Sequence, residues 1–214
     1  MLEFQNWGLL DYEEAFKRQE ELAEKVALEK SQGILVFCTH PPIVTLGRKT
    51  QEGDVYDWAG PIKEINRGGR ATYHGPSQLV VYPILNLAYQ GKSPDIHRYL
   101  RNFEDSIAEV ISSYGITAVG KTLQAKPDGE REEETGVWVG SQKIASLGIA
   151  VKKWVTLHGA AINLDEDSQA FSGMKPCGFT KDTMVSLEKV IGKKVDRKMF
   201  EELLRNKLLE SLCT

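Results

Sequence analysis

Helical spacing of the apolar positions predicts three helices along this chain. Residues 12–30 place apolar side chains one helical turn apart among charged ones, and the sequence Ser31-Gln32-Gly33 ends that helix. Residues 97–114 repeat the pattern after capping residues at 93–95, and Asp196 caps a last helix over residues 197–212. We expect the apolar side of the last helix to consist of Met199, Leu203, Leu204, Leu208 and Leu212.

Short apolar, β-branched runs predict strands between these helices. The predicted strands cover residues 34–38, 43–46, 62–66, 79–87, 116–119, 136–140, 143–151 and 155–163. The last three follow one another closely, which is typical of an antiparallel meander. Residues 121–135 are polar and acidic, and we expect an exposed loop or hairpin there. Runs of strands with helices between them predict an α/β or α+β fold, in which helices flank a mixed β-sheet.

Composition and charge narrow the class of protein. The 214 residues are 41% hydrophobic and 27% charged, as in soluble globular proteins, and we expect a single domain over residues 1–214. The formal net charge of −3 argues against a nucleic-acid partner bound through overall basicity. The N-terminus lacks the basic start and apolar stretch of a signal peptide, and no apolar run is long enough to span a membrane. These features predict a cytoplasmic protein that binds neither nucleic acid nor membrane.

The three cysteines are too few for a disulfide framework, which indicates a reducing compartment, and no pair has the spacing of a zinc site. Cys38 lies in an apolar run and is expected in the core, while Cys213 lies close to the C-terminus. Cys177 follows Lys175-Pro176 and precedes a glycine, so its thiol is held in a loop outside regular structure. It is the candidate nucleophile, and the alternative is an idle thiol in a turn.

A glycine-rich segment at residues 67–82 is a candidate binding loop. Gly68-Gly69 removes two side chains, so the backbone there can approach a ligand closely. Arg67 and Arg70 add positive charge on either side of the glycines. The pattern is neither a Rossmann nor a Walker motif, and the alternative is a tight turn with exposed basic residues.

Lys143 lies in a strand-like segment among apolar neighbours, before Ser146-Leu147-Gly148 and the later sequence His158-Gly159-Ala160-Ala161. One interpretation is a partly buried lysine, whose charged form a nearby thiolate would favour. Alternation along the segment leaves open the other interpretation, an exposed lysine on the solvent face of a strand.

Together, in this order and spacing, these segments resemble the lipoyl(octanoyl) transferases. The matching motifs are His40-Pro41-Pro42, Thr45-Leu46-Gly47-Arg48, Arg67-Gly68-Gly69-x-x-Thr72-Tyr73-His74 with Gln78 and Tyr82, Gly136-Val137-Trp138-Val139, Lys143-Ile144-Ala145-Ser146-Leu147-Gly148, His158-Gly159-Ala160-Ala161-x-Asn163 and Pro176-Cys177-Gly178. The resemblance runs from about Tyr12 to Leu187, most of the chain. One visible departure is Ser77, where the family usually has glycine or histidine; a positive φ there would cost serine about 1 kcal/mol.

The resemblance implies a fold like that of the biotin and lipoate–protein ligases. It implies transfer of an octanoyl group from octanoyl-acyl-carrier protein to a lysine of lipoyl domains, in 2-oxoacid dehydrogenase complexes and in the glycine cleavage H protein. By position, Cys177 would be the acyl-thioester nucleophile and Lys143 its activating partner. The residues implied to bind the acyl substrate are Arg67, Gly68, Gly69, Arg70, Ala71, Thr72, Tyr73, His74, Ser146, Leu147, Gly148, Gly159, Ala160 and Ala161. A thioester is already activated, so we expect no cofactor and no metal.

Several details of such a mechanism stay open in the sequence. Lys143, His74 and His158 are all candidates for moving the proton, and a backbone N–H near Cys177 or Gly178 is the expected oxyanion donor. Candidates for an apolar acyl slot are Val80, Leu147 and Ile149, which core packing would explain equally well. A basic face for an acidic carrier protein is expected from Arg48, Arg67, Arg70, Lys152 and Lys153.

Three alternative functions also stay open. An ATP-dependent lipoate–protein ligase of the same fold would continue the arginine–glycine motif with His-Asp, where this chain has His74-Gly75-Pro76. A cysteine acyl hydrolase would pair Cys177 with His158 and transfer the acyl group to water. A non-catalytic module that binds acylated proteins would be indifferent to the loss of Cys177.

Overall fold

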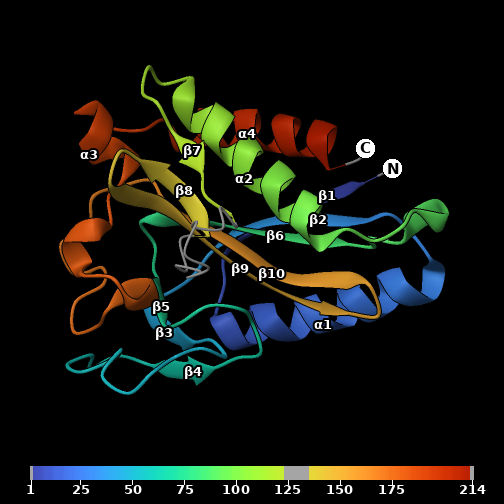
Figure 1. Ribbon diagram of the computed structural model, residues 1–214, viewed down its shortest axis with the longest axis horizontal. Helices are drawn as coiled ribbons and strands as arrows, with labels where there is room; N and C mark the ends of the chain where they lie inside the picture. The colour runs from blue at the N-terminus through green and yellow to red at the C-terminus, as the bar shows by residue number, and fades with distance from the viewer. Residues whose placement is uncertain (1, 123–134, 213–214) are drawn as a thin grey trace, which may run out of the picture.

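A seven-stranded mixed sheet forms the centre of the protein in the computed structural model, which describes residues 2–122 and 135–212. Its strand order is β1-β2-β6-β10-β9-β8-β7 (Figure 1). The strands are β1 (Glu3–Leu9), β2 (Gly33–Thr39), β6 (Gln78–Leu85), β7 (Val119–Gly120), β8 (Gly136–Val139), β9 (Gln142–Lys152) and β10 (Val155–Asn163). The β1–β2 pair is parallel and the other pairs are antiparallel, so the predicted meander of β8, β9 and β10 is confirmed.

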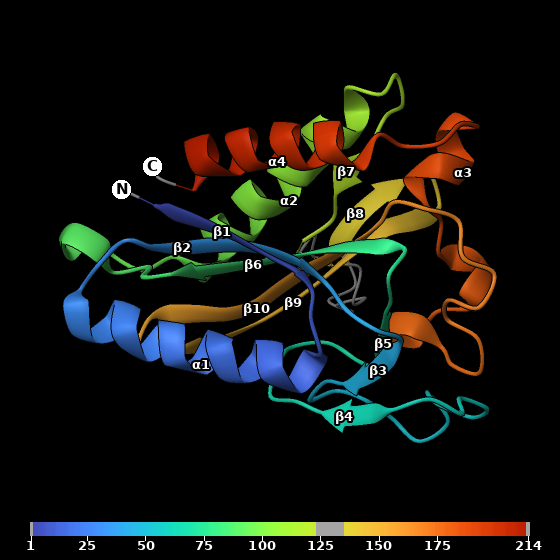
Figure 2. The same cartoon turned by 180° about the vertical axis from the view of Figure 1, so that it is seen from behind.

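A smaller sheet lies beside the central one, near the start of α1 (Figures 1 and 2). It consists of β4 (Ile62–Glu64), β3 (Ile43–Leu46) and β5 (Thr72–His74), in that order. β5 lies inside the glycine-rich segment, where the sequence suggested only a loop or turn. The segment is therefore a loop that leads into a short strand, and this strand holds the loop against β3.

Helices cover both faces of the central sheet (Figures 1 and 2). α1 (Tyr12–Glu29) packs on one face, and α2 (Ile96–Ser112) and α4 (Arg197–Ser211) pack on the other. α3 (Leu187–Ile191) and three short 3₁₀ turns, η1 (Tyr89–Gly91), η2 (Pro176–Gly178) and η3 (Lys181–Thr183), lie in the connections. The side chains of Asp95 and Asp196 accept hydrogen bonds from Arg98 N and Met199 N, which confirms both predicted caps. None of the helices in the described ranges is long and apolar enough to cross a membrane.

The alternating side chains of β2 show how the two cores form. Leu35 and Phe37 join the core beneath α2 and α4, while Ile34, Val36 and Cys38 join the core beneath α1. Because both faces are buried, β2 is a continuous apolar run in the sequence rather than an alternating one. Cys38 is a core residue, as predicted, and Cys213 lies outside the described residues.

The apolar side of α4 differs from the prediction. Phe200, Leu204 and Leu208 are fully buried, whereas Met199 is 50% exposed and Leu203 is 40% exposed. Phe200, Leu204 and Leu208 are four residues apart, so they form one row on the side of the helix that faces α2. Met199 and Leu203 lie beside this row and are partly exposed to solvent. β1 was missed in the sequence because it is an edge strand with mostly exposed or half-buried residues. Most of the predicted loop at residues 121–135 lies outside the described residues.

Candidate active site

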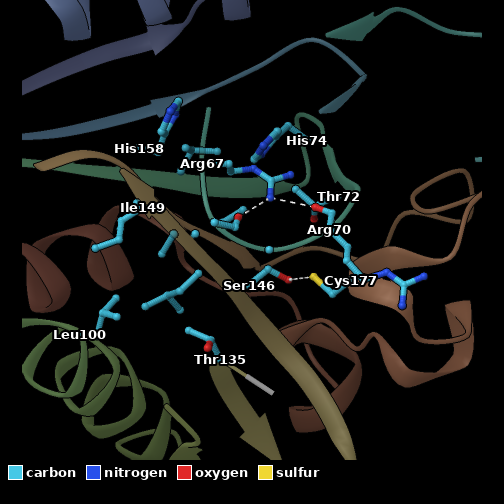
Figure 3. A pocket seen from close by; sticks show the side chains of 18 of the residues that line it. Arg67, Arg70, Thr72, His74, Leu100, Thr135, Ser146, Ile149, His158 and Cys177 are labelled. Carbon is cyan, nitrogen blue, oxygen red and sulfur yellow. Dashed lines mark hydrogen bonds between the residues drawn. The ribbon is translucent and has the colours of Figure 1, made fainter. Parts of the chain in front are cut away.

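A cavity of about 420 Å³ lies between the central sheet and the glycine-rich loop. All but two of the sixteen predicted site residues line it (Figure 3). Ala71 and Tyr73 do not: Ala71 is buried beneath the lining, and Tyr73 packs between Trp58 and Phe171. Because alternate residues of a strand face opposite ways, β5 points Thr72 and His74 toward the cavity and Tyr73 away from it.

Backbone hydrogen bonds fix the glycine-rich loop across β9. Gly68 N donates to Ile149 O at 2.9 Å, and Arg48 N donates to Arg67 O at 3.0 Å. The Gly68 bond places the loop against β9 beside Gly148, where an added Cβ would lie 2.9 Å from Gly68 O, and the Arg48 bond joins the loop to the end of β3. Ser77, the departure from the family pattern, has no positive φ, and its hydroxyl donates to Asp167 at 3.2 Å. Serine is therefore unstrained at this position.

Cys177 lies at the centre of the η2 turn, with a left-handed backbone at φ 54° and ψ 23°. Its thiol donates a hydrogen bond to Ser146 Oγ at 3.7 Å, at one side of the cavity (Figure 3). The Cys177 N–H donates to Ala71 O at 2.8 Å, and the Gly178 N–H donates to Lys175 O at 3.0 Å. Both amides thus donate to backbone carbonyl oxygens, and an oxyanion donor among the backbone N–H groups near Cys177 or Gly178 stays a prediction.

Lys143 is buried in β9, with only 1% of its surface exposed, and its side chain lines the same cavity as Cys177. Its ammonium nitrogen lies 5.5 Å from the centre of the Trp138 ring and 5.7 Å from that of Phe179. A Cβ at Gly136 would lie 2.5 Å from Lys143 Cε, so glycine is needed there to make room for the lysine. The rings of Trp138 and Phe179 and the absence of a side chain at Gly136 together leave a space that the buried Lys143 cation fills.

A buried carboxylate, Glu104 of α2, lies behind Lys143. It accepts hydrogen bonds from Thr122 N at 2.7 Å and from Gly136 N at 2.5 Å. Burial raises the pKa of the Glu104 carboxyl, while these hydrogen bonds and the charge of Lys143 lower it. Glu104 therefore holds the start of β8, including the glycine against which Lys143 lies.

Arg67 places a buried positive charge beside the cavity. Its guanidinium donates to Gly68 O, Arg70 O, Thr45 O and Thr45 Oγ1 at 2.8–3.0 Å, all neutral acceptors. Burial lowers its pKa, and the nearby Cys177, Tyr12 and Tyr82 raise it. This cation adds to the positive potential in which the Cys177 thiol lies.

Two histidines that line the cavity are neutral near pH 7. Burial and the nearby Arg67 lower the pKa of His158 to about 3, and burial, with His40 and Arg67, lowers that of His74 well below its usual value. His158 pairs with Ile149, three residues along β9 from Ser146, which corresponds to roughly 10 Å. In Figure 3, Arg67 lies between His158 and Cys177. The geometry therefore does not form a Cys177–His158 dyad.

Sequence comparison now gives the family. The lipoyl protein ligase A/B catalytic domain family matches residues 11–209. The octanoyltransferase of Bdellovibrio bacteriovorus is 56% identical over 214 residues, covering 98% of each chain. That of Geotalea uraniireducens is 39% identical over 194 residues, covering 91% of this chain and 84% of the relative. The chain belongs to the octanoyltransferase family. It is an acyltransferase.

Solved structures share the fold of this chain at low sequence identity. A putative lipoate protein ligase from T. acidophilum with bound lipoic acid has a TM-score of 0.68 at 18% identity, covering 99% of this chain and 85% of that one. Biotin protein ligase from Aquifex aeolicus, in complex with biotin and ATP, has a TM-score of 0.57 at 14% identity, covering 99% and 70%. The predicted ligase-like mixed sheet with flanking helices is confirmed.

The residues expected to form a basic face do not all lie together on the surface. Arg67 is buried, and Arg70 is paired with the buried Asp54. Lys152 lies at the β9–β10 turn, with its Nζ 3.9 Å from Glu24 Oε1, and it is six positions along β9 from Ser146, which corresponds to roughly 20 Å. Arg48 is exposed and lines the cavity, and the adjacent Lys49 does so too. The exposed positive charge at the mouth of the cavity is therefore at Arg48 and Lys49.

Several residues of the site were not predicted from the sequence. Lining residues such as Leu100 and Tyr12 come from the helices α2 and α1, outside the quoted motifs. Asp54 and Glu104 accept hydrogen bonds from the motif residues Arg70 and Gly136, respectively. A charged residue in a loop or a helix is usually exposed, so one sequence carries no signal that these two carboxylates are buried.

Proposed function

We propose that this single catalytic domain transfers an octanoyl group from octanoyl-acyl-carrier protein to the ε-amine of a lysine in lipoyl domains. The acceptors would be the lipoyl domains of 2-oxoacid dehydrogenase complexes and the glycine cleavage H protein. The observation that carries the proposal is the presence of Cys177 and the buried Lys143 in one cavity with an apolar lining. Val80, Leu147 and Ile149, the candidate acyl slot, all contribute to that lining. A volume of about 420 Å³ is in the range of small-ligand sites.

In the first step the Cys177 thiol loses its proton, and the thiolate attacks the thioester carbonyl of the donor. The new C–S bond forms, the bond to the carrier sulfur breaks, and the carrier leaves as a thiol that takes up a proton. Lys143 and Arg67 place two basic side chains in the lining of the cavity that also holds the Cys177 sulfur. The amides of Cys177 and Gly178 donate to carbonyl oxygens, so we assign side chains as further candidates for binding the oxyanion. Thr72 Oγ1 and Arg67 Nε are buried in the lining without a hydrogen-bond partner among the described residues.

In the second step a neutral lysine amine of the lipoyl domain attacks the Cys177 thioester. The C–N bond forms, the C–S bond breaks, and the proton lost by the amine returns to the Cys177 thiolate. We assign that proton transfer to Lys143, because the low pKa values of His74 and His158 disfavour their protonated forms near pH 7. Thioester to amide transfer is downhill, so the proposed reaction requires neither ATP nor a metal.

The test is transfer from octanoyl-acyl-carrier protein to a purified lipoyl domain, followed by intact mass of both proteins. We expect the lipoyl domain to gain one octanoyl group without ATP. Activity only with ATP and a free acid would support a ligase instead, and release of free octanoate without acceptor modification would support a hydrolase. Binding of the carrier with neither product would leave only an acyl-protein-binding module.

Charge at the cavity mouth gives a prediction about the donor. Carrier proteins are typically acidic, so Arg48→Glu should raise KM for octanoyl-acyl-carrier protein by about 5-fold, and added salt should raise the wild-type KM in the same direction. KM for an octanoyl thioester of a small thiol should stay unchanged. Lys152→Glu makes the same charge change far from the cavity and serves as the control. If KM for octanoyl-acyl-carrier protein changes neither with added salt nor in Arg48→Glu, an electrostatic docking site at the cavity mouth is excluded.

A further inference from the structure

A buried carboxylate in the loop between β3 and β4 reaches the turn that carries the nucleophile. Asp54 is 1% exposed, and both of its carboxylate oxygens contact Arg70: Arg70 Nε donates to Oδ2 at 3.0 Å, and Nη2 donates to Oδ1. Asp54 Oδ2 also accepts from Gln51 N at 2.9 Å. A two-point contact of this kind fixes the plane of the guanidinium as well as its place.

Arg70 lies directly against the residue that follows Cys177. A Cβ at Gly178 would lie 2.4 Å from Arg70 Nη1 and 2.7 Å from Cζ, so the guanidinium fills the space that a side chain would take. Gly178 has φ +83°, which glycine adopts without strain. The Arg70 guanidinium therefore packs directly against the η2 turn at Gly178.

Asp54 also contacts the turn on the other side of Cys177. Its carbonyl oxygen accepts a hydrogen bond from Lys175 N at 2.7 Å. Cys177 itself has φ 54°, a conformation that residues with a Cβ rarely adopt, so its surroundings must hold it there. The contacts of Asp54 and Arg70 bracket the nucleophile at residues 175 and 178, and the Cys177 N–H bond to Ala71 O holds it between them.

We propose that Asp54 is a positioning residue for Cys177, which acts by holding Arg70 against Gly178. Its role is to keep the thiol at the side of the cavity where Ser146 and the acyl carbonyl meet it. This inference rests on the proposed function, because it takes Cys177 as the acyl acceptor. It assigns Asp54 no contact with the substrate.

The test compares Asp54→Asn with the wild type in single-turnover formation of the octanoyl adduct. Asparagine has nearly the same shape but loses the charge and one acceptor for Arg70. We expect the maximal rate of adduct formation to fall about 10- to 100-fold, because small displacements of a reacting group are costly, while KM for the thioester changes less than about 3-fold. Alkylation of Cys177 by iodoacetamide, followed on its own peptide, should slow as well. Thermal unfolding measured alongside gives the folded fraction by which each rate is corrected.

Two more variants separate positioning from a general loss of structure. Arg70→Lys keeps the charge opposite Asp54 but loses the planar group against Gly178, so it should reproduce the effect, and the double variant should be no slower than the slower single one. Glu13→Gln removes an exposed ion pair with Lys63 and should change nothing. The inference is overturned if the corrected rate for Asp54→Asn stays within twofold of wild type, or if the two losses multiply. If the wild type transfers no octanoyl group, the proposed function fails, and the alkylation rates still decide the role of Asp54.

Discussion

Replacing Cys177 with alanine should abolish the octanoyl adduct and lower transfer to the lipoyl domain by roughly 10³-fold or more. The thiol is the nucleophile of the proposed first step, and no second thiol among the described residues lines the cavity. Cys177→Ser should be nearly as inactive, because a serine hydroxyl ionises far less readily than a thiol. Intact mass after mixing with octanoyl-acyl-carrier protein measures the adduct directly, and an adduct on Cys177→Ala would show that another residue accepts the acyl group.

Cys38→Ala is the matched control for that experiment. Cys38 is buried in β2, and burial raises the pKa of its thiol far above the usual value, so it is unreactive. We expect the variant to form the adduct at the wild-type rate, with a loss of about 1 kcal/mol in the free energy of unfolding from the small cavity left behind.

The sequence predicts the helices and strands of this fold best where the apolar positions repeat regularly and polar or glycine residues flank the segment. α1 and the meander β8–β10 have clear periodicity and flanking polar or glycine residues, and they were found nearly to the residue. β5 was hidden because its three residues follow two glycines and carry polar side chains. The face of α4 was misplaced because Met199 and Leu203 are apolar yet exposed, and apolar type alone does not say which row of a helix meets the core.

The candidate site could be assembled from sequence only as far as its motifs reach. Cys177, Lys143 and the glycine-rich loop line one cavity, as the resemblance implies. The interactions that hold them could not be derived, because they join residues far apart in the chain: Asp54 with Arg70, and Glu104 with Gly136. The same limit applies to the backbone at Cys177, since only the folded turn reveals that the Cys177 N–H bonds to Ala71 O.

Lys143→Met should lower the maximal rate of transfer by about 10³-fold while the protein stays folded. Methionine has a similar length and fits the space between Trp138, Phe179 and Gly136, but it supplies neither charge nor proton. Lys121→Met is the matched control. The Lys121 ammonium lies 4.2 Å from the centre of the same Trp138 ring, but Lys121 does not line the cavity. Wild-type rates in Lys143→Met, or an equal loss in Lys121→Met, would contradict a catalytic role for Lys143.

Stability of Lys143→Met should depend on pH in a direction set by Glu104. Burial already raises the pKa of that carboxyl, and the charge of Lys143 lowers it, so the variant raises the pKa further. The folded variant then binds a proton at Glu104 more readily than the folded wild type does, while the unfolded chains are alike there. Its free energy of unfolding, relative to wild type, should therefore rise as the pH is lowered from about 8 toward about 5. Urea titrations of both proteins across that range measure the difference, and adding Glu104→Gln to each should remove its pH dependence, which places the buried carboxylate and the buried lysine in one electrostatic unit.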